Sequence, residues 1–202
     1  CTSVICTDKT GTLTQNEMRV TDVLSLNHQG LLAASGDENA AALRIMVLCN
    51  NAVLTTANGP ARATGDPTET ALLLHAEASG SGTVARLLGE FPRVFERPFD
   101  STTREMATVQ RTSEGLEALL KGAPETVIDQ CSHVRHDGAL LALADDVRGQ
   151  LRASADELAR KGKRVLALAR KSVDAGADLD GAATGGGYEL VGLVAMHDPP
   201  RP

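Results

Sequence analysis

The sequence has very few aromatic residues: three of its 202 residues are Phe, one is Tyr and none is Trp. Flat surfaces for stacking against bases or rings are therefore scarce, and each aromatic side chain becomes a candidate for a specific role. An excess of basic residues is also missing, because 26 acidic residues outnumber 20 basic ones and the formal net charge is −6. Since proteins that bind nucleic acid normally present a basic face, this balance argues against nucleic acid as a partner.

Paired cysteines and long apolar runs are missing as well. The four cysteines have no Cys-x-x-Cys spacing, and the five histidines do not complete a zinc pattern. Free thiols in a reducing compartment are expected. The longest strongly apolar run, residues 190–196, is too short to cross a bilayer, and no signal peptide is visible. These features predict one soluble, monomeric domain, and the start inside a motif suggests a piece of a longer protein.

The hydrophobic pattern predicts an α+β fold, with helical pairs grouped between antiparallel strands. Strands are predicted at residues 19–26, 104–112, 116–122, 164–171 and 188–198, and helices at residues 37–50, 66–79, 124–131 and 147–158. Gly162 is expected to close the last helix. The Gly/Ala/Asp-rich segment 174–187 has no period, which predicts a mobile loop.

Two helix starts carry capping signals. Asp37 is expected to cap the first helix. In "GDPTETALL", Asp66 is expected to cap the next helix, Pro67 suits its first position, and Glu69 can complete a capping box.

Three phenylalanines, Phe91, Phe95 and Phe99, are spaced four residues apart. Pro92 and Pro98 exclude a continuous helix there. In an extended chain Phe95 and Phe99 share a face, because their separation is even. Phe91 and Phe95 are expected in the core.

The stretch "ICTDKTGTLTQNE", residues 5–17, places chemistry next to an apolar segment that reads as the end of a buried strand. Asp8 could attack a phosphoryl group and hold it as an aspartyl phosphate. Lys9 would offset negative charge, Thr10 could donate to phosphate oxygens, and Gly11 lets backbone N–H groups approach an anion. The alternative from these residues alone is an ordinary Asp-Lys-Thr-Gly turn. The Walker A pattern is absent from the sequence.

The segment "DKTGTLT" resembles the phosphorylation signature of the P-type ATPases, cation pumps that pass through an aspartyl phosphate. Five further segments follow in family order: "GDPTETALL", "PFDSTTREM", "KGAPE", "KRVLALA" and "GLVAMHDPPRP". The resemblance covers residues 1–202. It is closest to the type II, calcium-pump-like branch, for which "GDPTE" and "KGAPE" are typical.

The resemblance implies a twisted antiparallel sheet flanked by helical hairpins, the nucleotide-binding domain of such a pump. Residues 1–17 would be the first strand and phosphorylation motif of the phosphorylation domain with the outgoing hinge. Residues 18–196 would be the nucleotide-binding domain and residues 197–202 the return hinge. The partners would be ATP, the transported cation and the remaining domains of the same pump, which are the rest of the phosphorylation domain, the actuator domain and the transmembrane domain. Ca²⁺ is the first expectation for the cation. The domain would lie at the cytoplasmic face of a membrane.

The resemblance also implies a role for each site residue. Asp8, Lys9 and Thr10 would be catalytic, and Asp8 and Thr10 would hold Mg²⁺. Phe99 would stack on adenine, with a core phenylalanine as the alternative. Glu69 would accept a hydrogen bond from the adenine amino group, and its capping-box role is compatible with this.

Further residues would surround the phosphates. Lys121 resembles the lysine at the mouth of the pocket, with a plain surface lysine as the alternative, and Gly122 would let the nucleotide pass near the backbone. Arg104 stands where relatives commonly carry lysine, which changes reach and geometry but not charge. Arg164 would reach the phosphates, and Asp198 and Arg201 are weaker candidates in the return hinge.

The aspartates and lysine that would complete the magnesium site are expected after residue 202. We therefore predict that the chain binds adenine nucleotide but neither phosphorylates itself nor turns over ATP. A phosphatase of the haloacid-dehalogenase superfamily is the first alternative, but its general acid, a second Asp two residues after the first, is replaced here by Thr10. The second alternative is a non-catalytic nucleotide-binding or regulatory module.

Overall fold

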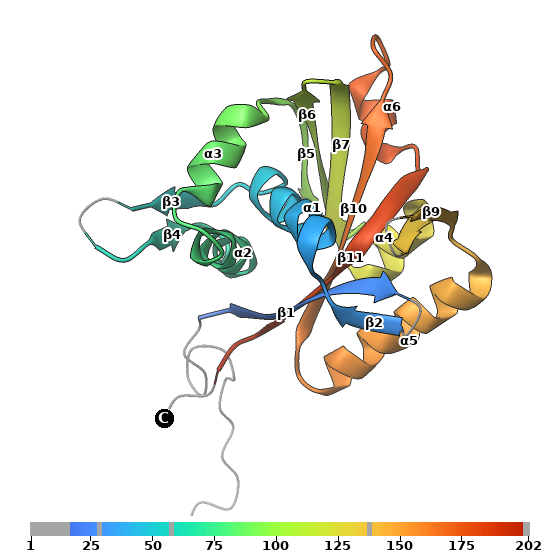
Figure 1. The fold of residues 1–202 in the computed structure, drawn as a ribbon, viewed down its shortest axis with the longest axis horizontal. Coiled ribbons are helices and arrows are strands. Elements are labelled where there is room, and N and C mark those ends of the chain that lie inside the picture. Colours follow the sequence, from blue (N-terminus) through green and yellow to red (C-terminus); the bar gives the residue numbers. More distant parts are fainter. Residues whose placement is uncertain (1–16, 28–29, 57–58, 137–138, 200–202) are drawn as a thin grey trace, which may run out of the picture.

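A twisted sheet forms the centre of the computed structural model, which describes residues 17–27, 30–56, 59–136 and 139–199 (Figure 1). Its strand order is β2-β1-β11-β10-β7-β6-β5, with β8 beside β11 and β9 beside β8, while β3 and β4 form a separate ribbon. The strands are β1 (Arg19–Asn27), β2 (Gly30–Ala33), β3 (Val53–Thr55), β4 (Arg62–Thr64), β5 (Arg93–Asp100), β6 (Glu105–Thr112), β7 (Gly115–Gly122), β8 (Cys131–His136), β9 (Ala139–Ala142), β10 (Arg164–Val173) and β11 (Tyr188–His197). The helices are α1 (Gly36–Leu48), α2 (Pro67–Ala78), α3 (Thr83–Glu90), α4 (Pro124–Gln130), α5 (Asp145–Arg160) and α6 (Leu179–Thr184).

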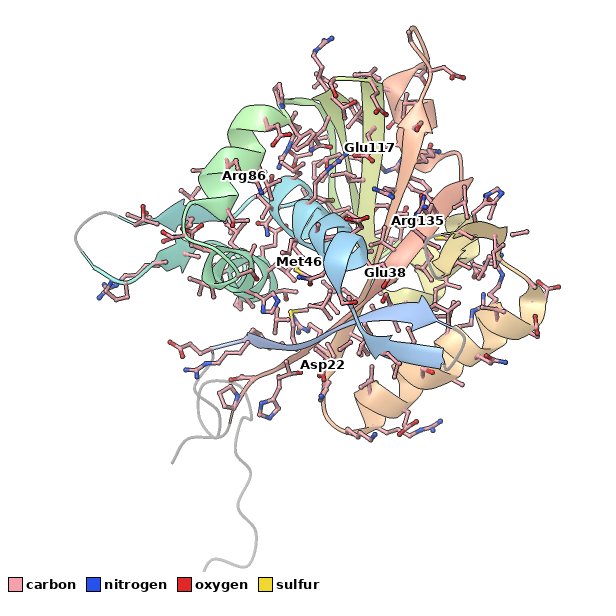
Figure 2. All side chains as sticks on the ribbon, viewed as in Figure 1. Asp22, Glu38, Met46, Arg86, Glu117 and Arg135 are labelled. Carbon is pink, nitrogen blue, oxygen red and sulfur yellow. The ribbon has the colours of Figure 1, made fainter. Side chains whose placement is uncertain are left out.

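Helices cover both faces of this sheet and create two cores. On one face α1, α2 and α3 pack against residues such as Leu119 of β7, and Met46 lies in the buried side of α1 (Figure 2). On the other face α4, α5 and α6 pack against Leu120, the next residue of the same strand. This alternation is the period of two of a strand with both faces buried. The predicted α+β class and antiparallel sheet are confirmed, with one parallel pair, β8 against β11.

Antiparallel pairing brings several strand ends to one edge of the sheet. Asp100, at the end of β5, pairs with Glu105 at the start of β6, and Glu105 pairs with Gly122 at the end of β7. Arg164, at the start of β10, pairs with Met196 near the end of β11. We call this the site edge, defined by residues 99–105, 121–122, 164 and 196–198.

Several predicted local features are confirmed. Strands β6 and β7 form the expected hairpin around Ser113 and Glu114. The Asp66 side chain accepts hydrogen bonds from the backbone N–H groups of Thr68 and Glu69, with Pro67 at the first position of α2. Gly162, at φ +78°, follows α5 in the left-handed conformation that favours glycine.

Three predictions of local structure are wrong. Ser35, not Asp37, is the cap residue of α1, its side chain makes no capping bond, and Asp37 lies inside the first turn. Segment 174–187 is not simply a loop, because it contains α6, whose start is capped by Asp178. The Glu69 carboxylate completes no capping box, since it bonds to Asn51 and Lys121 instead.

The three phenylalanines differ in burial. Phe91 and Phe95 pack partly buried against the two different cores, as expected for core residues. Phe99 is 60% exposed, and the β5–β6 register shifts between Arg97 and Asp100. Even spacing fixes a face only in a regular strand, and this irregularity lies between the two residues, so the expectation that Phe95 and Phe99 share a face stays a prediction.

Candidate functional site

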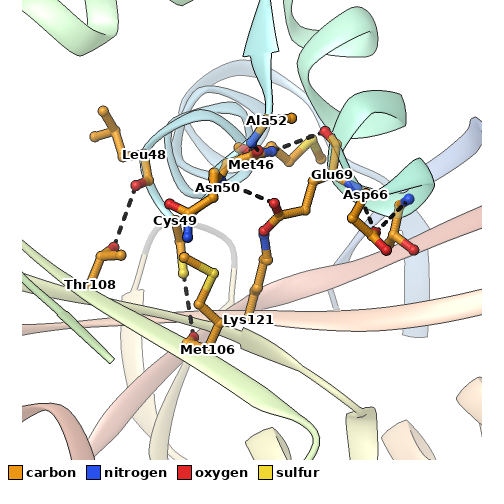
Figure 3. A network of polar contacts seen from close by, with 12 residues as sticks. Met46, Leu48, Cys49, Asn50, Ala52, Asp66, Glu69, Met106, Thr108 and Lys121 are labelled. Carbon is orange, nitrogen blue, oxygen red and sulfur yellow. Dashed lines mark hydrogen bonds and ion pairs between the residues drawn. The ribbon is translucent and has the colours of Figure 1, made fainter. Parts of the chain in front are cut away.

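A buried ion pair between Lys121 and Glu69 lies at the centre of the site edge (Figure 3). The Lys121 Nζ and Glu69 Oε1 atoms are 2.6 Å apart, and the two side chains are 7% and 14% exposed. Lys121 is the last residue but one of β7 and lies on the same face as Leu119, and Glu69 comes from the first turn of α2. The interpretation of Lys121 as a plain surface lysine is therefore wrong.

The second oxygen of Glu69 is held by the bend that follows α1. The backbone N–H of Asn51 donates to Glu69 Oε2 over 3.1 Å, and the side-chain amide of Asn50 donates to the Glu69 backbone carbonyl over 3.0 Å. Each carboxylate oxygen thus has a partner, yet a carboxylate offers about four acceptor positions. Capacity remains for a further donor. Sequence reasoning missed both asparagines, although two adjacent amides at the predicted end of a helix were a visible signal.

Phe99 and Arg104 flank the β5–β6 turn at the same edge. The exposure of Phe99 excludes its role as a core residue and leaves a ring face available for stacking. Arg104 has φ +57°, uncommon for a non-glycine residue. Its guanidinium lies 2.7 Å from the Glu125 carboxylate, and both side chains are more than half exposed. The Arg104 charge therefore remains accessible to solvent.

Gly122 has a reason within the protein for lacking a side chain. A Cβ atom there would lie 2.5 Å from the Arg104 carbonyl oxygen and 2.8 Å from Glu105 Cα. The close approach of β6 thus requires glycine at this position. The presence of glycine at position 122 is therefore no evidence that a nucleotide passes close to the backbone there.

Arg164 reaches the residue beside Glu69. Its Nη1 atom donates to Thr68 Oγ1 over 2.5 Å. Two adjacent residues of α2 thus contact basic side chains: Thr68 contacts Arg164 of β10, and Glu69 contacts Lys121 of β7. At the end of β11, Asp198 Oδ1 accepts from the Glu17 backbone N–H over 3.3 Å.

Two groups near the Lys121–Glu69 pair have pKa values shifted from their ordinary ones. A hydrogen bond from Asn51 and the neighbouring Arg93 lower the pKa of Glu96 against the raising effect of burial. Burial raises the pKa of the Cys49 thiol, next to this bend. Glu96 is therefore an anion and Cys49 a neutral thiol.

Four candidate residues, Asp8, Lys9, Thr10 and Arg201, lie outside the described residues. Within the described ranges, no cluster of three or more His, Cys, Asp or Glu side chains suited to a metal is found. Of the helices that the structure describes, none has the length and apolar character needed to cross a membrane.

An α+β domain with helices on both faces of an antiparallel sheet is consistent with the cytoplasmic N domain of P-type ATPases. The family model described as "P-type ATPase, cytoplasmic domain N" matches residues 38–202, and the chain belongs to this family.

Named relatives agree with this assignment. The chain is 34% identical to "Calcium-transporting ATPase 1" of Bacillus cereus over 98% of its length and 35% identical to "Calcium-transporting ATPase 1" of Lactococcus lactis over 99%. It is 29% identical to "Calcium-transporting ATPase" of Bacillus subtilis over 100%. The chain spans 22%, 23% and 25% of the length of these relatives.

Proposed function

We propose that the chain binds adenine nucleotide at the site edge. Glu69 accepts a hydrogen bond from the adenine amino group, Phe99 stacks on the base, and Lys121 lies at the mouth of the pocket. Arg104 and Arg164 face the phosphates. The observation that carries the proposal is the buried Glu69–Lys121 pair, at an edge that also holds an exposed ring and two arginines.

The chemistry of this edge suits a purine with a charged tail. A planar base needs an apolar face and an acceptor for its amino group, and phosphates need cations in reach. A buried ion pair is a poor source of stability, because desolvation offsets much of the attraction. Its presence at an edge with further charges is therefore better explained by binding than by folding alone.

In the intact pump, the nucleotide-bearing domain would bring the γ-phosphate to Asp8. Asp8 would attack the phosphorus, Lys9 would offset the charge, and Thr10 would donate to a phosphate oxygen. The proposed division is residues 1–17 for the phosphorylation motif with the outgoing hinge, 18–196 for the nucleotide domain and 197–202 for the return hinge. Asp198 and Arg201 would then act mainly in the hinge.

Mg²⁺ would be held by Asp8, Thr10 and the phosphates, and it would neutralise charge on the transferred group. Among the described residues no cluster of three or more His, Cys, Asp or Glu side chains is suited to a metal, and the two protein ligands proposed here lie outside them. The names of the relatives support Ca²⁺ as the transported cation. The description of the matched family supports a place at the cytoplasmic face of a membrane.

Calorimetric titration of the purified chain with ATP tests the proposal. Binding is expected, and it should weaken in Glu69→Gln and Phe99→Ala but not in Arg160→Gln, an exposed position at the end of α5. Absence of ATP binding by the unmodified chain would refute the proposal and favour a regulatory module. Phosphate release by the isolated chain that Asp8→Asn abolishes would refute our prediction that the chain is catalytically inactive.

A further inference from the structure

The peptide group between Asn50 and Asn51 is hydrogen-bonded at both ends. Its carbonyl oxygen accepts from Arg93 Nη2 over 2.5 Å, and its N–H donates to Glu69 Oε2 over 3.1 Å. Because a peptide group is planar and rigid, holding its oxygen also fixes the direction of its N–H. Arg93 therefore controls the orientation of the donor that Glu69 receives.

Arg93, the first residue of β5, makes three further hydrogen bonds from the same guanidinium. It donates to the Leu48 carbonyl over 2.8 Å, to Asn51 Oδ1 over 2.6 Å and to Glu96 Oε2 over 2.8 Å. Five N–H donors in a rigid plane can satisfy these acceptors together, whereas a lysine ammonium cannot reproduce the fork. The bend after α1 is thus fastened to β5 through one side chain.

The same bend holds the backbone of Glu69. The Asn50 amide donates to the Met46 carbonyl over 2.9 Å and to the Glu69 carbonyl over 3.0 Å, while its oxygen accepts from the Ala52 N–H over 2.8 Å (Figure 3). Residues 50–51 therefore hold both the main chain and the carboxylate of Glu69. A charged donor on the Asn50 carbonyl also polarises the peptide and strengthens its N–H as a donor.

We infer that Arg93 is a positioning residue that makes the site select adenine over guanine, acting through the Asn50–Asn51 peptide on Glu69. This inference rests on the proposed function and deepens it. Held by Asn51 and Lys121, the carboxylate points its remaining acceptor positions in one direction, toward an amino group. Guanine has a carbonyl oxygen where adenine has that amino group, so a fixed carboxylate repels it. A carboxylate that is free to rotate can accept hydrogen bonds from other N–H groups of guanine, so the site no longer discriminates between adenine and guanine.

The test compares Arg93→Met with Arg86→Lys. Arg86 lies on α3, its side chain is 63% exposed, and it forms an ion pair with Glu90 on the same helix (Figure 2). Dissociation constants for ATP and GTP are measured by calorimetry on the whole 202-residue chain. The unmodified chain is expected to prefer ATP, Arg93→Met to reduce that preference about tenfold, as for loss of one charge-assisted contact, and Arg86→Lys to leave it unchanged.

Testing Arg93→Met in the Glu69→Gln variant separates a role in positioning Glu69 from a role in stabilising the fold. In Glu69→Gln, addition of Arg93→Met should change the ATP/GTP ratio less than about twofold, because the group through which Arg93 acts has already changed. Arg93→Lys, which keeps the charge without the fork, should also lose preference for ATP and serves if Arg93→Met does not fold, as judged by circular dichroism.

The outcomes are distinguishable. Equal weakening of ATP and GTP in the Arg93 variants would show a merely structural role and overturn the inference alone. An unchanged ratio with intact ATP binding would do the same. No ATP binding by the unmodified chain would overturn the proposed function and the inference with it.

Discussion

Arg164 Nη1 lies 2.5 Å from Thr68 Oγ1, which fastens the start of β10 to the start of α2 one residue before Glu69. This contact joins two segments that are 96 residues apart in sequence. A hydroxyl is a neutral partner for a guanidinium, and an anionic phosphate is a stronger one. The contact therefore holds the cation near the Glu69–Lys121 pair without neutralising it.

Arg164→Gln is expected to weaken ATP binding about tenfold, the size of one lost charge-assisted hydrogen bond, while adenosine binding stays unchanged. The reason is that Arg164 would meet only the phosphates. Calorimetry with the two ligands measures the difference, and a rise in ionic strength should reduce it. Equal losses for ATP and adenosine would contradict a phosphate role. Arg160→Gln, on α5, is the matched control.

The buried ion pair gives a prediction for stability. Lys121→Met leaves the Glu69 carboxylate buried without its cation and should lower the free energy of unfolding by about 3 kcal/mol. The double variant Lys121→Met/Glu69→Leu should recover most of this loss, because an apolar pair replaces an ion pair at little cost. Urea denaturation measures both. If the double variant is as unstable as the single one, the loss comes from packing and not from an unpaired charge.

Phe99 and Phe95 form a natural comparison within one strand. Phe99→Ala should change the free energy of unfolding by less than about 0.5 kcal/mol, because the ring is mostly exposed. The same change should weaken ATP binding about tenfold through lost stacking. Phe95→Ala removes a ring packed against the core and should cost about 2 kcal/mol of stability. Thermal melting and calorimetry on both variants check this, and stability loss in Phe99→Ala would argue against the role in stacking.

Local signals in the sequence predicted the parts of the fold that local interactions make. The Asp66–Pro67 start of α2 and the β6–β7 hairpin are of this kind, since a cap and a tight turn involve neighbouring residues. Segment 174–187 differs from the predicted loop because a Gly/Ala/Asp-rich composition without a period gives no local signal for a helix. Its helix α6 is held by tertiary contacts with β5, β6 and β7, and Ala183 is buried in the core.

At the candidate site, too, individual residues could be predicted from the sequence but the contacts between distant segments could not. Motif resemblance singled out Glu69, Lys121 and Arg164 but could not say that Glu69 meets Lys121 52 residues later. The contacts of Arg93 could not be predicted, because its four acceptors come from the α1 bend and from β5, and nothing in "FPRVFE" indicates that bend. Contacts between distant segments depend on the packed sheet, which spacing alone does not specify.

Acid should destabilise the protein through His75, in the last turn of α2. Burial lowers the pKa of His75 below its ordinary value of 6.5, because a charged imidazolium is disfavoured there. The unfolded chain therefore takes up the proton first as pH falls below about 6.5, and stability decreases until pH passes the lower pKa of the folded state. At pH 8 both states are neutral at this residue and it contributes no pH dependence. Urea denaturation from pH 5 to 8 should show that His75→Gln flattens part of this slope, while the difference between variant and unmodified chain stays constant near pH 8. An identical slope in the two proteins would show that His75 is as readily protonated in the folded state as in the unfolded chain.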